Sequence, residues 1–106
     1  MQAVILTGGL GTRLRPITRT IPKGLVKVAG KPFLEYQISF IKKSGIEDIL
    51  LCVGYLGDRI ADLFGDGSNF GVRIEYSAED RPRGTGGALE LALPKLRNEF
   101  YLLNGD

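Results

Sequence analysis

The sequence predicts an α/β fold, a three-layer sandwich in which helices cover both faces of a mostly parallel sheet. Short, continuously apolar runs such as residues 3–6 and 49–53 recur along the chain, as expected for strands that are buried on both faces. Segments with apolar residues at helical spacing separate these runs. Strands that alternate with helices form parallel sheets through right-handed crossovers, so the pattern favours this architecture.

The first predicted strand, residues 2–7, leads directly into a glycine-rich segment. Three glycines follow within four positions, and the basic residues Arg13 and Lys23 come after them. Glycine has no Cβ, so it lets backbone N–H groups approach an anion and turn toward one point. The segment is therefore typical of a loop that binds an anion.

A helix is expected to begin at Pro32, because proline suits the first helical position. Leu34, Ile38 and Ile41 fall on one face of this helix and predict its packing against the core. Gly45 is expected to end it.

The middle of the chain predicts two further strands and a short helix. Residues 48–53 form a second buried strand, and Asp58 is expected to cap a helix that ends before the turn at residues 65–67. Residues 72–76 alternate between apolar and polar side chains, which suits a strand near the edge of the sheet. A polar loop is expected over residues 77–84.

The last predicted elements are a helix and a strand. Thr85 is expected to cap the helix, and its apolar side includes Ala88 and Ala92. Pro94 should end or kink it, because proline cannot continue a helix. The final strand is expected over residues 99–103.

The composition is that of an ordinary globular protein of one domain. Of the 106 residues, 43% are apolar and 25% are charged. No apolar run approaches the roughly 20 residues of a membrane span, and the N-terminus lacks a signal-peptide pattern. We therefore expect a cytoplasmic protein that does not insert in a membrane. Glycine, at 15 residues, is about twice as frequent as usual, which indicates tight turns or close backbone contacts with a ligand.

Cysteine and histidine usage narrows the available chemistry. The single cysteine, Cys52, lies in an apolar run and is expected to be a buried structural residue. The chain has no histidine, which excludes a Ser-His-Asp triad, a Cys-His pair and histidine-ligated zinc. The groups that remain available for catalysis or binding are carboxylates, lysine, arginine and the backbone.

The charge is distributed unevenly along the chain. The first 34 residues contain six basic residues and no acidic residue, whereas the remainder contains eight basic and twelve acidic residues. This asymmetry points to an anionic ligand of the first third. Nucleic acid is a less favoured ligand, because no aromatic residue precedes Phe33 and no nucleic-acid-binding motif is present.

Three polar clusters follow predicted strands, at residues 8–23, 77–87 and 104–106. Ligands of open α/β sheets bind beyond the carboxyl ends of the strands, so these clusters are expected to converge on one cleft. Neither common phosphate motif fits. Leu14 stands where the dinucleotide fingerprint needs its third glycine, and the lysine of a would-be Walker loop is followed by Pro32.

The motifs resemble the signature of the sugar-1-phosphate nucleotidylyltransferases, also called NDP-sugar pyrophosphorylases. The matching segments are Gly8-Gly9-x-Gly11-Thr12-Arg13-Leu14-x-Pro16-x-Thr18, Pro22-Lys23, Val28-x-Gly30-Lys31-Pro32, Gly84-Thr85-Gly86-Gly87-Ala88 and Asn104-Gly105-Asp106. These segments form three separated motifs, at residues 8–32, 84–88 and 104–106, whose fitting distances make the resemblance specific, and it spans essentially the whole chain. Within the family, the chain is most similar to the mannose- and heptose-1-phosphate guanylyltransferases.

The resemblance implies a Rossmann-like fold and a reaction between two substrates. An oxygen of a sugar 1-phosphate attacks the α-phosphorus of a nucleoside triphosphate, and pyrophosphate leaves. The implied catalytic residues are Arg13, on the triphosphate, and Lys23, on the sugar phosphate. The implied nucleotide-binding residues are Leu6, Gly8, Gly9, Gly11, Thr12, Arg13, Gly84 and Thr85. Asp106 is the implied ligand of Mg²⁺, which prefers carboxylate oxygen.

The resemblance also sets limits. Gly24 stands where family members commonly carry a second proline, and Thr7 where a small residue such as alanine is usual. The family's catalytic domain continues well past the metal-binding carboxylate. Residues 1–106 therefore correspond to a truncated nucleotidyltransferase domain, its nucleotide-binding half, which we expect to turn over poorly alone.

The sequence leaves two other functions and the oligomeric state open. The alternative is a non-catalytic module that senses nucleotide or assembles with partners, and the presence of Arg13 and Lys23 argues against it. A different phosphate-binding enzyme such as a kinase is disfavoured by the failed motif spacings. An uncovered strand at residues 99–103 would make a homo-oligomer plausible.

Overall fold

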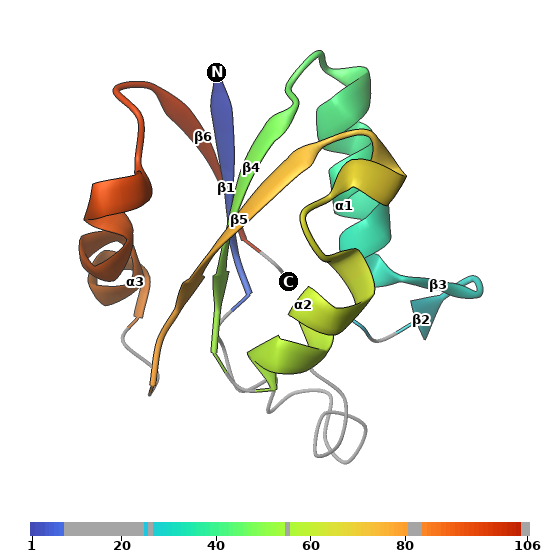
Figure 1. The fold of residues 1–106 in the computed structure, drawn as a ribbon, viewed down its shortest axis with the longest axis horizontal. Coiled ribbons are helices and arrows are strands. Elements are labelled where there is room, and N and C mark those ends of the chain that lie inside the picture. The colour runs from blue at the N-terminus through green and yellow to red at the C-terminus, as the bar shows by residue number, and fades with distance from the viewer. Residues whose placement is uncertain (8–24, 26, 55, 81–83, 105–106) are drawn as a thin grey trace.

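The central element of the fold is a parallel sheet of four strands (Figure 1). The computed structural model describes residues 1–7, 25, 27–54, 56–80 and 84–104. Within them the strand order is β5-β4-β1-β6, and every neighbouring pair is parallel. The strands are β1 (Gln2–Leu6), β4 (Asp48–Val53), β5 (Arg73–Ala78) and β6 (Phe100–Asn104).

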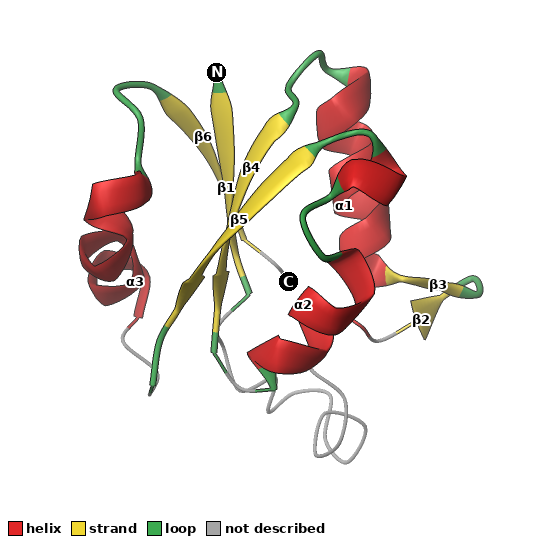
Figure 2. Cartoon of the chain, viewed as in Figure 1, coloured by secondary structure: helices red, strands yellow, loops and turns green. Residues whose placement is uncertain are grey.

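Helices cover both faces of this sheet, and the predicted three-layer α/β architecture is confirmed. Helices α1 (Phe33–Lys43) and α2 (Gly57–Phe64) lie on one face, and α3 (Gly84–Ala92) lies on the other (Figure 2). The side chains of β1 alternate between the two layers, with Ala3 and Ile5 in the cluster of α1 and α2 and Val4 in the cluster of α3. Burial on both faces explains why the strand is continuously apolar.

Helix α1 packs as its spacing predicts, with Leu34, Ile38 and Ile41 buried. Its first residue is Phe33, so the expectation that Pro32 opens the helix is wrong by one position. Pro32 has extended backbone, with ψ 139°, and lies before the helix. Gly45 follows the helix with a φ of +91°, a left-handed value that suits glycine.

The expected caps of the other two helices are wrong. Helix α2 begins at Gly57, so Asp58 lies within its first turn, and Leu56 precedes it with a left-handed φ of 56°. Helix α3 begins at Gly84, so Thr85 lies inside it. The stop at Pro94 is confirmed, because α3 ends at Ala92 and a 3₁₀ turn follows.

The remaining differences concern short elements and strand ends. The strand expected at the sheet edge is β5, and its place at the edge is confirmed, although it runs to Ala78. The sequence did not predict the hairpin of β2 (Lys27–Val28) and β3 (Lys31–Pro32), nor the 3₁₀ turn Ser68–Phe70. Among the helices that the structure describes, none has the length and apolar character needed to cross a membrane.

Candidate functional site

The carboxyl ends of β1 and β6 lie side by side, and they mark the candidate site. From β1 the chain moves to β4 and β5, then crosses back to add β6 on the other side of β1. Such a reversal of strand order opens a crevice beyond the carboxyl ends of the two strands. Leu6 at the end of β1 is paired with Asn104 at the end of β6. The glycine segment and Gly105-Asp106 continue from these two ends.

Thr7 fixes the chain where it leaves β1. Its backbone N–H donates to the carbonyl oxygen of Cys52 at 2.8 Å, and its hydroxyl donates to the same oxygen at 2.9 Å. Its side chain is 1% exposed. In the sequence Thr7 stands out only as a departure from the family pattern, because a bond to a residue 45 positions away leaves no local signal.

The first turn of α3 approaches the same edge of the sheet. The helix packs on β1 and β4 through Ala88 and Ala92. A helix that connects two parallel strands runs opposite to them, so its N-terminus lies at their carboxyl edge. Figure 1 shows α3 beginning at that edge. Gly84 and Thr85, two predicted contacts of the nucleotide, are the first residues of this helix.

The predicted polar cluster at residues 77–87 is split between the end of β5 and the start of α3. Ser77 and Ala78 belong to β5 itself, which is separated from β1 by β4. Glu79 follows, and its backbone N–H donates to the carbonyl of Val53 at 2.8 Å. Within the described residues, only the start of α3 brings this cluster toward the β1 and β6 ends.

Cys52 lies close to this edge but is not suited to react. Burial raises the pKa of its thiol to about 11, and the Glu79 carboxylate adds to the effect. A thiol with this pKa is protonated at neutral pH and is a poor nucleophile. The predicted structural role of Cys52 is confirmed by its burial.

Most of the predicted contact residues lie outside the described residues. These are Gly8, Gly9, Gly11, Thr12, Arg13, Lys23 and Asp106. Of the predicted set, the structure therefore places Leu6, Gly84 and Thr85. Within the described ranges, no group of three potential metal-binding side chains comes together.

Two described arginines form ion pairs at the opposite edge of the sheet, where the strands begin. Asp48 at the start of β4 forms ion pairs with Arg73 at 2.6 Å and with Arg97 at 3.6 Å. The Gln2 side chain adds bonds to the backbone of Lys95 and Arg97, each at 3.0 Å. Arg73 and Arg97 therefore hold the amino ends of the strands together, at the edge of the sheet opposite the candidate site.

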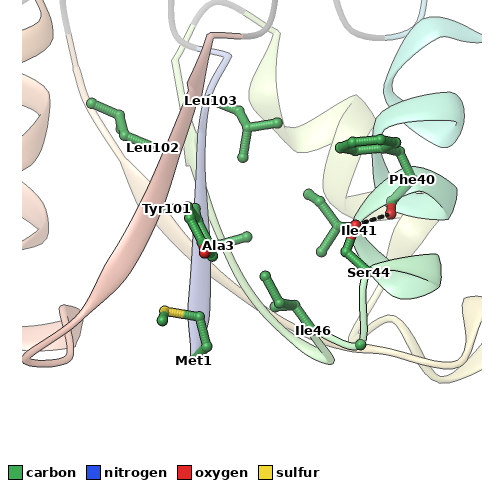
Figure 3. A pocket seen from close by; sticks show the side chains of 10 residues that line it. Met1, Ala3, Phe40, Ile41, Ser44, Ile46, Tyr101, Leu102 and Leu103 are labelled. Carbon is green, nitrogen blue, oxygen red and sulfur yellow. Dashed lines mark hydrogen bonds between the residues drawn. The ribbon is translucent and has the colours of Figure 1, made fainter.

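A hollow of about 500 Å³ lies on the α1 side of β1 and β6 (Figure 3). We call it the apolar groove. Phe40 and Ile41 of α1 line it from one side and Tyr101 and Leu103 of β6 from the other. None of its lining residues has a charged side chain. The groove is therefore not built to hold a phosphate.

Comparisons with known proteins agree on one family. The family described as nucleotidyl transferase matches residues 2–106. D-glycero-alpha-D-manno-heptose 1-phosphate guanylyltransferase of Campylobacter jejuni is 47% identical over the whole chain, and mannose-1-phosphate guanylyltransferase of Mycobacterium tuberculosis is 45% identical. The chain covers 48% and 30% of these two proteins.

A solved structure shows the same likeness in three dimensions. HddC from Yersinia pseudotuberculosis, complexed with GMP-PN, superposes with a TM-score of 0.85 at 36% identity. The match covers 99% of this chain and 47% of HddC. The chain thus spans less than half the length of each of these three proteins.

Proposed function

Because the chain belongs to the nucleotidyl transferase family, we propose that it is the nucleotide-binding half of a sugar-1-phosphate nucleotidylyltransferase domain. The observation that carries this proposal is the pairing of Leu6 with Asn104, because the chain runs on from these two adjacent strand ends toward Gly8 and toward Asp106. The whole protein would couple a nucleoside triphosphate to a sugar 1-phosphate and release pyrophosphate. Residues 1–106 alone would turn over poorly.

The proposed reaction needs no nucleophile from the protein. A phosphate oxygen of the sugar 1-phosphate forms a new bond to the α-phosphorus, and the bond from that phosphorus to the bridging oxygen of pyrophosphate breaks. Catalysis then consists of positioning and charge neutralisation. We assign Arg13 to the triphosphate and leaving pyrophosphate, and Lys23 to the attacking sugar phosphate. A chain without histidine and with a protonated Cys52 suits this chemistry.

The nucleotide would lie between the end of β1 and the start of α3. We assign the backbone of Gly8, Gly9, Gly11 and Thr12, with Leu6, to the nucleotide. Gly84 and Thr85 would contact the base. The packing of α3 on β1 and β4, which sets its first turn at the carboxyl edge of the sheet, supports this assignment.

Mg²⁺ is the proposed metal. It is usually bound through one or two carboxylates together with substrate phosphates. Asp106 comes two positions after Asn104, the last residue of the strand beside β1, and its carboxylate is of the type that this donor set needs. When bound, the ion would supply positive charge to the phosphates.

Guanine is the base that the comparisons favour. Two relatives are named as guanylyltransferases, and the similar solved structure holds GMP-PN. A heptose or mannose 1-phosphate is the corresponding second substrate. As the sequence predicts, we also propose a cytoplasmic location and no role for nucleic acid or a membrane. We propose a homo-oligomer on the basis of the apolar groove.

Calorimetric titration tests the proposal. The chain is expected to bind GTP with Mg²⁺, weakly, and more tightly than CTP, dTTP, UTP or ATP. Arg13→Ala should lose roughly tenfold or more in affinity, as for a charge-assisted contact. Lys27→Ala is the control, because Lys27 is an exposed residue of the β2–β3 hairpin. No binding of any of the five nucleotides, or equal affinity in Arg13→Ala, would contradict the proposal.

The alternative, a module that binds nucleotide without catalysis, shares the same site. A pyrophosphate-release assay with GTP and mannose or heptose 1-phosphate separates the two functions when it is run on the whole domain, because residues 1–106 alone are expected to turn over poorly. Release above background that is lost in Lys23→Ala supports the transferase. Binding of GTP without any release supports the alternative.

A further inference from the structure

Thr7 is the last described residue before the glycine segment, and two hydrogen bonds tie it to β4. One bond, from its N–H, continues the pairing of β1 with β4 beyond Leu6 and Cys52. The second bond comes from the side chain and ends on the same carbonyl oxygen. A carbonyl oxygen has two lone pairs, so it can accept both.

The second bond constrains the chain in a way that the first does not. The N–H bond fixes the nitrogen of Thr7 but leaves rotation about its N–Cα bond. The hydroxyl bond also fixes the direction from Cα to Cβ, and with it the φ angle. Gly8 and Gly9 have no side chains through which the protein could guide them. Thr7 is therefore the last residue whose side chain directs the chain before these glycines.

We propose that Thr7 is a positioning residue for nucleotide binding. Its hydroxyl sets the direction in which the chain leaves the sheet toward Gly8, Gly9 and Gly11, and thereby the affinity of that segment for the triphosphate. The inference rests on the proposed function. It adds a residue that makes none of the predicted ligand contacts and acts through the backbone that follows it.

Two substitutions separate this role from simple stabilisation of the sheet. Thr7→Val keeps the branched shape and removes the hydroxyl, and Thr7→Ser keeps the hydroxyl. In Thr7→Val the carbonyl of Cys52 retains its bond from the N–H of residue 7. No buried acceptor is left unpaired, so the fold is expected to survive. Circular dichroism checks this for each variant.

Hydrogen–deuterium exchange of the peptide over residues 8–13 and calorimetric titration with GTP and Mg²⁺ are the two measurements. Thr7→Val is expected to exchange faster in this peptide and to raise the Kd roughly three- to tenfold, the effect of one lost hydrogen bond. Thr7→Ser should restore both values. Ser44→Ala is the matched control. Ser44 follows α1, and the substitution removes a hydrogen bond of 3.0 Å that its hydroxyl donates to the carbonyl of Phe40. It should change neither value.

Each other result counts against the inference. Unchanged exchange and Kd in Thr7→Val overturn it, as does a lower melting temperature alone. Equal defects in Thr7→Ser and Thr7→Val would show that the hydroxyl is not the cause. If the unsubstituted chain binds no nucleotide, the proposed function fails, and the exchange data alone decide whether Thr7 directs the segment.

Discussion

At the scale of single residues, hydrogen-bond partners and burial determine which side chains take part in chemistry. Cys52 illustrates this, because its thiol packs with Val4 and Leu50 under α3 while its carbonyl accepts the two bonds from Thr7. The residue contributes through its backbone, and its sulfur behaves as a small apolar group. Cysteine at this position is thus explained by packing.

The ionisation of Cys52 gives a stability prediction. The pKa of its thiol is raised to about 11 in the folded chain, against 9.0 when unperturbed, chiefly by burial and then by Glu79. Between these pH values the unfolded chain has released the proton and the folded chain has kept it. The free energy of unfolding should therefore fall as pH rises from 9 to 11. Urea denaturation across this range measures the fall.

Cys52→Ala is the control for this prediction, since lysines and tyrosines also titrate at high pH. The substituted chain has no thiol to ionise, so its stability should fall less steeply. Parallel pH profiles for the two chains would show that the thiol makes no such contribution.

At the scale of elements, the turn between α2 and β5 depends on a glycine in a crowded place. Gly67 has a φ of +86°, and a Cβ there would lie 2.7 Å from the carbonyl oxygen of Val72. Gly30, in the β2–β3 hairpin, has nearly the same φ, +84°, with nothing within 4 Å of an added Cβ. The two positions differ in the space around them.

Alanine substitutions at these glycines should therefore differ in cost. Gly30→Ala should lower the free energy of unfolding by about 1 kcal/mol, because alanine is strained in a left-handed backbone. Gly67→Ala also forces the backbone apart and should lower it by about 3 kcal/mol. Chemical denaturation of both variants measures the difference. Equal costs would mean that the turn relaxes around the added methyl group.

The main elements could be predicted because each has a strong local pattern. Strands β1 and β4 are apolar on both faces, and α1 shows its buried face at helical spacing. The β2–β3 hairpin has no such pattern, since its strands are two residues long and mostly exposed. The cap predicted at Asp58 was wrong because Leu56, with its left-handed backbone, precedes the helix, and α2 begins two residues earlier than a cap at Asp58 would allow.

The site could be predicted only in part. The crossover rule is enough to gather the polar clusters at the carboxyl edge, and the pairing of Leu6 with Asn104 agrees with it. The role of Thr7 could not be foreseen, because its partner is determined by strand pairing and not by sequence spacing. The contacts assigned to Arg13 and Lys23 stay predictions.

At the scale of the whole molecule, the two edges of the sheet differ in charge. Strand β5 carries Arg73 and Glu75, both exposed, and charged side chains discourage pairing of an edge with another chain. Strand β6 carries no charged residue, and no described strand pairs with its outer side. Tyr101 and Leu102 are exposed on it, beside the apolar groove.

These features predict self-association through β6. Leu102→Lys places a charge in the middle of the strand and should shift the chain toward monomer. Leu63→Lys is the matched control, because Leu63 on α2 is 48% exposed against 43% for Leu102. Sedimentation velocity at high protein concentration measures the assembly. A strictly monomeric unsubstituted chain, or equal association in Leu102→Lys, would count against the prediction.

The position of β1 in the sheet has a consequence for folding kinetics. It is a central strand, yet one neighbour is the last described strand, and Gln2 bonds to the carbonyl of Lys95, 93 positions along the chain. Contacts between such distant segments slow folding, because a long loop must close before they form. During synthesis, the edge of β1 that pairs with β6 therefore has no partner until Phe100–Asn104 has been made. An unpaired strand edge can pair with another chain, so this interval favours misassembly.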